Sequence, residues 1–184
     1  RNGIHLALEP YQFARKDNSA SVMIALNRFS YSSKSYPGFK VFKKECMRVI
    51  SIFNKIIRLE ELNRIGLRYI NIIPFLREDT SLPMKRFFNF VRPLEDFFES
   101  DFLHFSNHVS FPLASGNITI HTEVIEGKNS NREAFLLDMD YARVNNLNVN
   151  NIETYLEEAH DISTVQFNKI ITKDYYEYIR VGGI

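Results

Sequence analysis

The sequence has one cysteine, no long apolar run and almost no net charge. Each of these features excludes a class of structure or of binding. Cys46 is the single cysteine, so no disulfide can form within the chain. No stretch approaches the roughly 18 uninterrupted apolar residues of a membrane-spanning helix, and no signal-peptide pattern opens the chain. Lysine and arginine number 23 against 22 aspartates and glutamates, so net charge alone attracts no nucleic acid. We therefore predict a cytoplasmic protein with no membrane partner.

The motifs of the commonest enzyme classes are also missing. There is no G-x-S-x-G elbow, phosphate-binding glycine loop, dinucleotide fingerprint or H-E-x-x-H pair, so hydrolase, kinase and dehydrogenase designs have no support. What is present is a large core: 45% of the residues are apolar, with 16 Phe and 9 Tyr. Such a chain folds without metals or disulfides. We predict a single domain over residues 1–184, with no cofactor.

The first third of the chain predicts three strands and a long helix. Short apolar runs at 11–14, 22–26 and 29–31 are separated by the turn-forming Lys16-Asp17-Asn18-Ser19 and by Asn27-Arg28. We interpret them as an antiparallel meander. From Phe39 the apolar residues recur at spacings of three and four as far as Ile57, which is typical of an amphipathic helix.

The middle of the chain is less regular. Residues 64–73 alternate and are rich in β-branched and aromatic residues, which predicts an interior strand ended by Pro74. Pro83 can begin a short helix as far as Val91, and residues 97–105 fit either a helix or a strand.

The last part repeats the pattern of strands before a helix. Strands are expected at 108–113, 117–125 and 134–144, followed by an Asn-rich linker at 145–151, a long helix from Ile152 to about Thr172, and a Tyr-rich tail. This order predicts an α+β fold, in which two meanders form an antiparallel sheet with two long helices packed on one face. A loose two-fold repeat of meander plus helix is a further hypothesis.

The run Gly66-Leu67-Arg68-Tyr69-Ile70-Asn71 carries a resemblance. Tyr11-Gln12-Phe13, Asn27-Arg28-Phe29-Ser30, Tyr36-Pro37, the acidic run 136–140, His160, Phe167 and Ile171-Thr172 agree with the same pattern. The chain resembles a sporadically distributed bacterial family of uncharacterised proteins that has a G-L-R-Y-I-N strand motif. The resemblance implies an apolar strand ahead of Arg1 and no known activity. It departs at the tryptophan expected after Tyr36-Pro37, where this chain has Phe39 or Phe42.

The candidate site residues lie on two of the expected strands. Arg64 and Arg68 flank Gly66 on one face of a strand, which makes a cationic notch able to grip a phosphate or carboxylate. Asp138 and Asp140 also share one strand face. We favour pairing of the two arginines with the two aspartates in one network over an anion site. Asn71 and His160 join the list through the resemblance, and for His160 we prefer a core hydrogen bond to a general-base role.

Two alternatives to a structural network remain open. Asp138 and Asp140 could hold Mg²⁺ in a phosphodiester-acting enzyme, with Glu123 or His160 as a further ligand. His104 and His108 have metal-ligand spacing only if they lie on a helix, so we predict no structural zinc. The basic side of the first long helix could bind nucleic acid through Lys40, Lys43, Lys44, Arg48, Lys55 and Arg58.

We therefore predict a non-catalytic protein-interaction or regulatory domain. The abundance of Phe and Tyr suits contact surfaces, and no convergent set of polar residues indicates catalysis. A protein partner is expected. The metal-dependent enzyme and the nucleic-acid binder are the alternatives, and the sequence leaves the oligomeric state open. Because the chain begins at Arg1 rather than Met, we expect a processed terminus or a longer protein.

Overall fold

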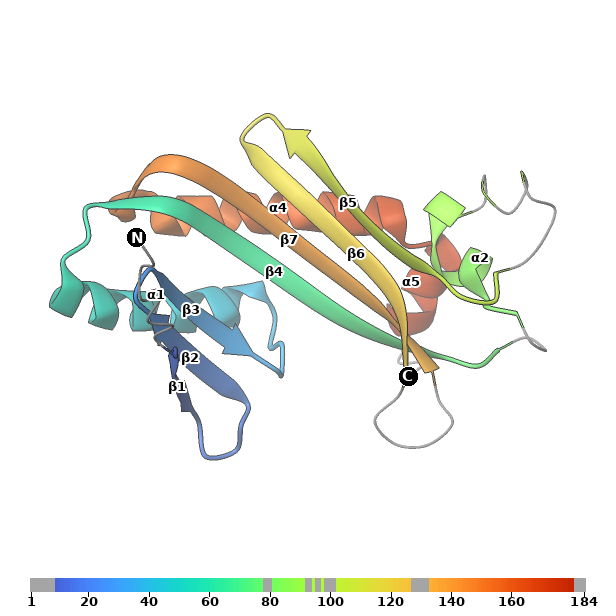
Figure 1. Cartoon of the computed structure of the whole chain (residues 1–184), viewed down its shortest axis with the longest axis horizontal. Helices are drawn as coiled ribbons and strands as arrows, with labels where there is room; N and C mark the ends of the chain where they lie inside the picture. Colours follow the sequence, from blue (N-terminus) through green and yellow to red (C-terminus); the bar gives the residue numbers. More distant parts are fainter. Residues whose placement is uncertain are drawn as a thin grey trace, which may run out of the picture. The chain divides into compact units, whose positions relative to one another are not determined.

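A computed structural model describes residues 9–77, 81–91, 94, 97, 102–126 and 133–180. Contacts divide the chain into two compact units, residues 1–59 and 60–184. Each unit contains one antiparallel sheet and one long helix (Figure 1), which confirms the predicted α+β class. The two meanders lie in two separate sheets rather than in the one sheet that was expected. The prediction that the whole chain is a single domain stays a prediction beside this division. Residues 98–101, in the stretch for which helix and strand were both open, lie outside the described part.

The first unit is the predicted meander followed by the predicted helix. Its elements are β1 (Tyr11–Ala14), β2 (Ala20–Ala25), β3 (Arg28–Ser33) and α1 (Phe39–Ile57). The sheet order is β1-β2-β3, with antiparallel pairing throughout. Asn18 adopts the left-handed backbone (φ 56°) that the β1–β2 turn needs.

Aromatic rings join α1 to β3. Phe29 stacks on Phe53, with ring centroids 4.5 Å apart, and Tyr31 meets Phe42 at 5.5 Å. Phe29 and Tyr31 share one strand face, and Phe42 and Phe53 lie about three helical turns apart on one side of α1. The helix therefore packs on the sheet face that carries Phe29 and Tyr31.

The second unit is a four-stranded antiparallel sheet with one long helix. Its strands are β4 (Glu61–Phe75), β5 (Ser106–Leu113), β6 (Gly116–Glu126) and β7 (Glu133–Asn148), in the order β4-β7-β6-β5. Its helices are α2 (Met84–Phe87), α4 (Ile152–Ile170) and α5 (Lys173–Arg180), with the 3₁₀ turns η1 (Asn89–Val91) and η2 (Val149–Asn151). The meander β5-β6-β7 and its 19-residue helix match the order of the first unit, whose helix also has 19 residues.

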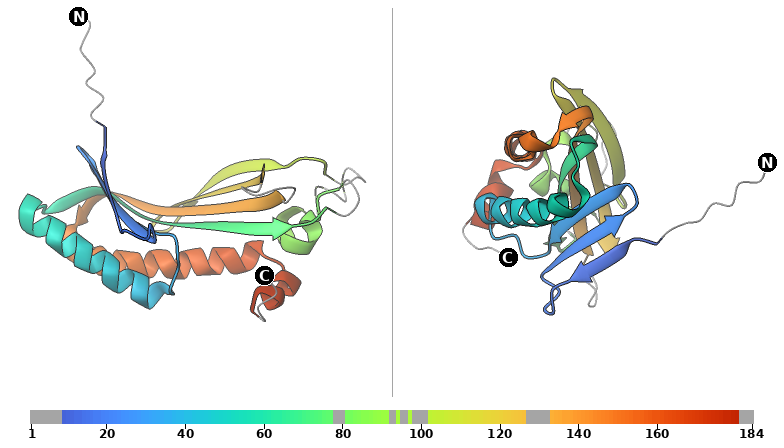
Figure 2. Two further views of the ribbon diagram at one scale, coloured as in Figure 1. Left: turned by 90° about the horizontal axis from the view of Figure 1, so that it is seen from below. Right: turned by 90° about the vertical axis from the view of Figure 1, so that its left-hand side faces the viewer.

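One face of the four-stranded sheet is covered by α4, which packs on β4 and β7 (Figure 2). We call this the inner face and the opposite one the outer face. Burial in β4 follows the alternation, since Leu67, Ile73 and Phe75 are buried on the inner face whereas Arg68, Ile70 and their neighbours two apart are exposed.

The aromatic core of the second unit gathers where β4 ends. Phe75 stacks on Phe135 at 4.1 Å, and Phe87 and Phe88 meet the edges of the Phe135 ring. Tyr175 of α5 packs edge-on against Phe87 at 4.7 Å. Residues 173–180, expected only as a Tyr-rich tail, form the helix α5, whose Tyr175 brings apolar surface to this core.

Three segments differ from the sequence predictions in their position or their boundaries. The strand expected to be interior lies at the sheet edge, where β4 pairs only with β7 in the described sheet, and it passes through Pro74 to Phe75. An edge strand tolerates proline, because the backbone groups on its outer side form no hydrogen bonds to a neighbouring strand and a missing N–H is not needed there. The helix expected from Pro83 to Val91 breaks at Phe88, which bridges to Ile171. The Asn-rich linker is mostly strand, with left-handed backbone at Asn145 and Asn146.

Candidate functional site

The two arginines and two aspartates predicted to pair do form ion pairs on the outer face. Arg68 donates from Nε to Asp138 Oδ1 (2.7 Å) and from Nη2 to Oδ2, and Arg64 Nη2 donates to Asp140 Oδ2 (2.8 Å). In the β4–β7 register Arg68 lies opposite Asp140. Each arginine therefore reaches diagonally along the sheet, toward the β7 residue that lies opposite a later position of β4.

Gly66 makes the longer of these reaches possible. A β-carbon at Gly66 would lie 3.0 Å from Arg64 Nη1 and 3.2 Å from Cζ, so the guanidinium lies over the glycine on its way to Asp140. The notch expected between Arg64 and Arg68 is therefore filled by the Arg64 guanidinium itself. This geometry favours the structural network over an open anion site.

The two pairs differ in their exposure to water. Asp138 is buried, with 8% of its surface exposed, whereas the Asp140 and Arg64 side chains are 35% and 54% exposed. The hydrogen bonds that Arg68 donates to Asp138 raise the pKa of its guanidinium, and the charges of Asp138 and Asp140 raise it further, against a lowering effect of burial. The Arg68–Asp138 pair therefore satisfies a buried carboxylate, which is the costlier group to leave alone.

The outer face carries a second polar group on β5 and β6. His121 lies opposite both His108 and Asp138, with the two imidazole centroids 5.6 Å apart. His121 Nε2 lies 3.3 Å from a Glu123 carboxylate oxygen. Sequence reasoning named His108 and Glu123 singly but missed His121. The alternation of residues 117–125 was the available signal, because it places residues 119, 121 and 123 on one face.

Asn71 and His160 do not join the arginine–aspartate network. Asn71 donates from its side chain to the Leu137 carbonyl at 3.2 Å, within the sheet. His160, on α4, lies against the inner face, where its Nδ1 is 2.9 Å from the Tyr69 hydroxyl. Burial lowers the pKa of the His160 imidazole, against a smaller raising effect from Asp161. The structure thus splits the candidate residues between two sheet faces, and His160 has the core hydrogen bond that the sequence reasoning preferred.

A polar cluster that the sequence did not indicate links β7 to α4. Arg143 Nη1 donates to Glu158 Oε2 at 2.6 Å and its guanidinium lies 4.8 Å from the Tyr155 ring centroid. The Tyr141 hydroxyl bonds to Glu158 and to the Ser115 hydroxyl. Burial raises the pKa of the Glu158 carboxyl, but hydrogen bonds and the Arg143 charge outweigh it and leave that pKa lowered. This cluster holds the helix on the sheet.

The geometry of the described residues gives little support to a metal site at Asp138 and Asp140. No group of three or more His, Cys, Asp and Glu side chains that could hold a metal ion occurs within the described ranges. His160 cannot assist Asp138 and Asp140, because it lies on the opposite sheet face. Both Asp138 oxygens already accept from Arg68. A metal at this position would have to displace that guanidinium.

The basic side of α1 is partly occupied. Arg48 bonds to Glu45 at 3.2 Å, while Lys40, Lys44 and Lys55 are exposed. Solvated helix faces are ordinarily charged in this way. Nucleic-acid binding by α1 stays a prediction.

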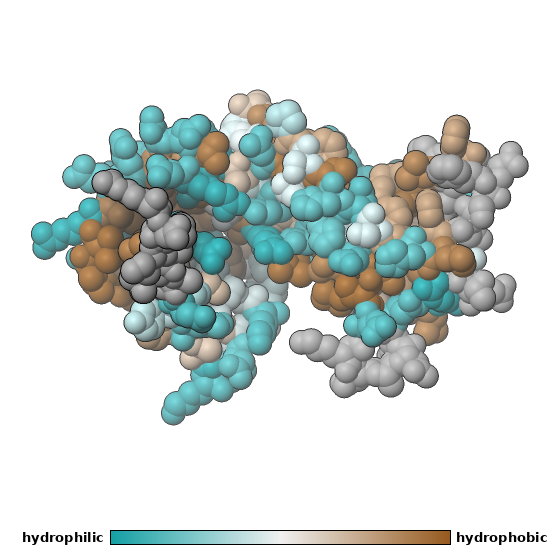
Figure 3. Space-filling view, viewed as in Figure 1, coloured by the Kyte–Doolittle hydropathy of each residue, from teal (hydrophilic) through white to brown (hydrophobic). Residues whose placement is uncertain are grey.

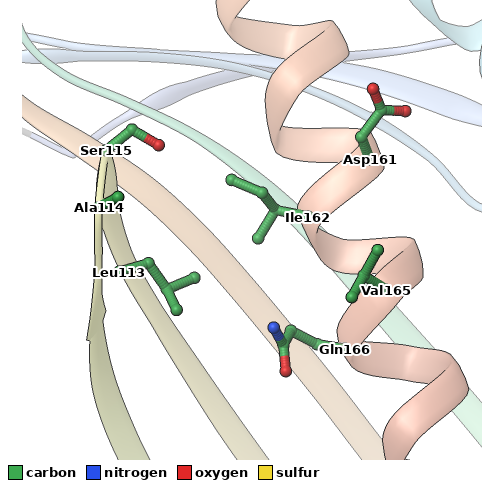
Figure 4. A pocket seen from close by; sticks show the side chains of 7 residues that line it. All are labelled: Leu113, Ala114, Ser115, Asp161, Ile162, Val165 and Gln166. Carbon is green, nitrogen blue, oxygen red and sulfur yellow. The ribbon is translucent and has the colours of Figure 1, made fainter.

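A hollow of about 320 Å³ lies between the β5–β6 turn and α4 (Figure 4). Figure 4 shows Leu113, Ala114 and Ser115 on the side of the turn. The side of the helix is lined by Asp161, Ile162, Val165 and Gln166. None of the predicted site residues lines it, so the hollow is separate from the arginine–aspartate network.

An apolar patch adjoins the charged network on the outer face. Ile70 and Ile72 are 56% and 52% exposed, and Leu136 lies opposite Ile72. We call Ile70, Ile72 and Leu136 the isoleucine patch. Figure 3 shows mainly polar residues over the first half of β4 and apolar residues gathered over its second half. An exposed apolar patch with a polar rim is typical of a protein contact surface.

No relative adds information to this geometry. The resemblance to the family with the G-L-R-Y-I-N motif stays a prediction, and so does a bacterial origin. Within the described residues, none of the helices combines the length and the apolar character needed to cross a membrane. Comparisons of the chain with protein-family models, curated proteins and solved structures found no match.

Proposed function

We propose that this chain is a non-catalytic protein-interaction domain, and that a partner polypeptide docks on the outer face of the four-stranded sheet. The isoleucine patch carries the proposal. Ile70 and Ile72 expose more than half of their surface on a face that α4 leaves uncovered. Burying two such side chains contributes roughly 1.5–3 kcal/mol each to association, before the costs of binding.

The charged network beside the patch supports a contact role rather than catalysis. Arg64, Arg68, Asp138 and Asp140 neutralise one another, so a partner would meet a rim whose charges are already paired. Such a rim costs less to desolvate than isolated charges. A catalytic carboxylate, in contrast, needs a free oxygen for a metal or a proton.

The shape of the surface points to a polypeptide partner. Small molecules bind in concave sites, and the hollow beside α4 is lined by residues of the β5–β6 turn and the helix rather than by outer-face residues. The outer face instead offers an open row of side chains from adjacent strands, in which apolar residues lie next to charges of both signs. That composition suits a protein interface.

The test compares two double variants of the tagged chain purified from its natural source. Ile70→Ser with Ile72→Ser removes the patch, while Val41→Ser with Ile56→Ser removes similarly exposed side chains from α1. We expect a stoichiometric polypeptide to accompany the wild type and the α1 variant but not the patch variant. The recombinant partner should then bind the patch variant at least about tenfold more weakly, which corresponds to about 1.4 kcal/mol.

Two results would overturn the proposal. One is a partner that binds the patch variant as tightly as the wild type. The other is a Mg²⁺- or Mn²⁺-dependent cleavage of phosphodiesters that disappears in Asp140→Asn, which would establish the enzyme alternative. A salt-sensitive shift of labelled DNA or RNA would favour nucleic-acid binding instead.

A further inference from the structure

The free edge of β1 differs from the other free sheet edges that the structure describes. Its sequence, Tyr11-Gln12-Phe13-Ala14, contains no charge and no proline, and Tyr11 and Phe13 are 73% and 60% exposed. Proteins ordinarily protect an edge strand by keeping it short or with charges, proline, a bulge or a covering helix, and of these devices β1 has only its length of four residues, between Pro10 and Arg15. An unprotected edge is a template for pairing with another strand.

The other edges each have such protection. On β4 there are two arginines, Pro74 and a register irregularity between Leu62 and Arg64. On β5 there is Pro112. The aromatic side chains of β3 pack against α1. Among these edges, β1 alone combines exposed aromatic side chains with an unprotected backbone.

The backbone of β1 presents a defined set of hydrogen-bonding groups. Arg15 N donates to Ala20 O at 2.9 Å, beyond the end of the β1–β2 ladder. Because backbone direction alternates along an antiparallel strand, Phe13 and Tyr11 direct their N–H and C=O groups toward β2. Gln12 and Ala14 therefore direct theirs to the free edge.

We infer that β1 pairs with β1 of a second copy of this chain, in antiparallel orientation about a two-fold axis at Phe13. The outward-facing residues are two apart, so Gln12 of each copy lies opposite Ala14 of the other. Each of these two pairs supplies two backbone hydrogen bonds. A second copy of β1 thus satisfies all of these backbone groups, and because any antiparallel strand could do so, the side chains of this register decide for a second copy.

The side chains fit this register. Phe13 lies opposite the second copy's Phe13 at a pair without hydrogen bonds, where cross-strand side chains approach most closely. Tyr11 lies opposite Arg15, so no like charges meet within the ladder. A two-fold axis normal to the sheet keeps both copies of Phe13 on the α1 face, where the row Phe13-Val22-Tyr31 already runs. The Phe13 rings of the two copies would then cover each other.

The interface is small, which sets the expected strength of the dimer. A ladder that runs only from residue 11 to residue 15 of each copy buries less than the roughly 1,200 Å² of a standard stable interface. We therefore expect a dimer that dissociates on dilution. Sedimentation or light scattering from low to high micromolar protein should show a mass that rises from one chain toward two.

A cysteine trap tests the register. Phe13→Cys places two thiols face to face across the axis, at the Cα separation of about 4.5 Å that a disulfide accepts. Gln12→Cys is the matched control, because Gln12 lies on the opposite sheet face and is displaced from its own copy by two residues. Mild oxidation should join Phe13→Cys chains and leave Gln12→Cys chains apart. The wild type, whose Cys46 is buried, shows the background.

A charge variant tests the same edge without a covalent trap. Phe13→Lys sets two ammonium groups opposite each other and should abolish the dimer, whereas Leu26→Lys, at an 88% exposed position of the same unit, should leave it intact. A wild type that stays monomeric at high micromolar concentration would overturn the inference, as would equal oxidation of the two cysteine variants. Neither result touches the isoleucine patch, so the proposed function is tested separately.

Discussion

The guanidinium of Arg64 lies over Gly66, with Nη1 3.0 Å from the place that a β-carbon at residue 66 would occupy. This contact lets Arg64 reach Asp140, which lies opposite Arg68 in the β4–β7 register. The missing side chain at Gly66 therefore leaves the space that the Arg64 guanidinium occupies.

Replacing Gly66 by Ala should uncouple Arg64 from Asp140. The added methyl group meets only the far end of a flexible side chain, so the guanidinium moves aside. We expect a change in unfolding free energy below about 1 kcal/mol, since the lost pair is exposed. A double-mutant cycle of Arg64→Gln and Asp140→Asn should give a coupling of about 0.2–1 kcal/mol in the wild type and none in Gly66→Ala. An unchanged coupling would contradict the contact.

Replacing Gly116 by Ala should be far more damaging. Its β-carbon would lie 2.4 Å from the Ala142 carbonyl oxygen, which is backbone and cannot swing away. We expect a loss of about 1–3 kcal/mol in unfolding free energy, as for overpacking in other proteins. Chemical denaturation measures it, with Gly66→Ala as the matched glycine control. Equal stability of the two variants would mean that β6 and β7 do not approach so closely.

Arg68→Gln should destabilise the protein more than Arg64→Gln. Arg68 serves the buried Asp138 with two hydrogen bonds, whereas Arg64 serves the half-exposed Asp140 with one. We expect a loss of about 1–3 kcal/mol for Arg68→Gln and below about 1 kcal/mol for Arg64→Gln. Thermal denaturation of both variants and of Asp138→Asn measures this. Unchanged melting temperatures for Arg68→Gln and Asp138→Asn would show that the network adds nothing to stability.

His160 should make stability fall on acidification. Burial lowers the pKa of its imidazole in the folded state, so the unfolded chain takes up the proton first as the pH drops. Its contribution is present above the ordinary imidazole pKa of about 6.5 and is lost as the pH falls below it. His160→Gln, whose amide can still form a hydrogen bond with the Tyr69 hydroxyl, should flatten the melting-temperature profile in that window. NMR titration should place the pKa of His160 below the ordinary imidazole value, and a pKa above that value would contradict this assignment.

Cys46 should react slowly with thiol reagents. Burial in α1 raises the pKa of its thiol to about 11, so little thiolate is present at neutral pH. We expect alkylation of the native protein to be far slower than that of the unfolded chain, and slower than that of an exposed thiol introduced as Leu26→Cys. Mass spectrometry of timed samples measures all three rates. Equal rates for Cys46 and the introduced thiol would show that α1 does not shelter it.

Periodicity carried the prediction of most elements, and tertiary contacts corrected the rest. The strands around Phe13, Phe29 and Ile120 and the two long helices follow from local alternation and from three- and four-residue spacing, because each must bury one face. Local pattern did not reveal the helix around Tyr175, since its support comes from Phe87, far away in the sequence. Nor did it reveal that β4 is an edge strand, because strand order depends on which partners pair.

The candidate site divides in the same way. Residue type and alternation alone indicated that Arg64, Arg68, Asp138 and Asp140 would pair. Opposite charges on the same face of neighbouring strands attract one another and form ion pairs. The sequence could not say which arginine meets which aspartate, because that depends on the β4–β7 register and on the diagonal reach over Gly66. The separation of His160 from this network was decided only by folding, which sends odd and even residues of β4 to opposite faces of the sheet.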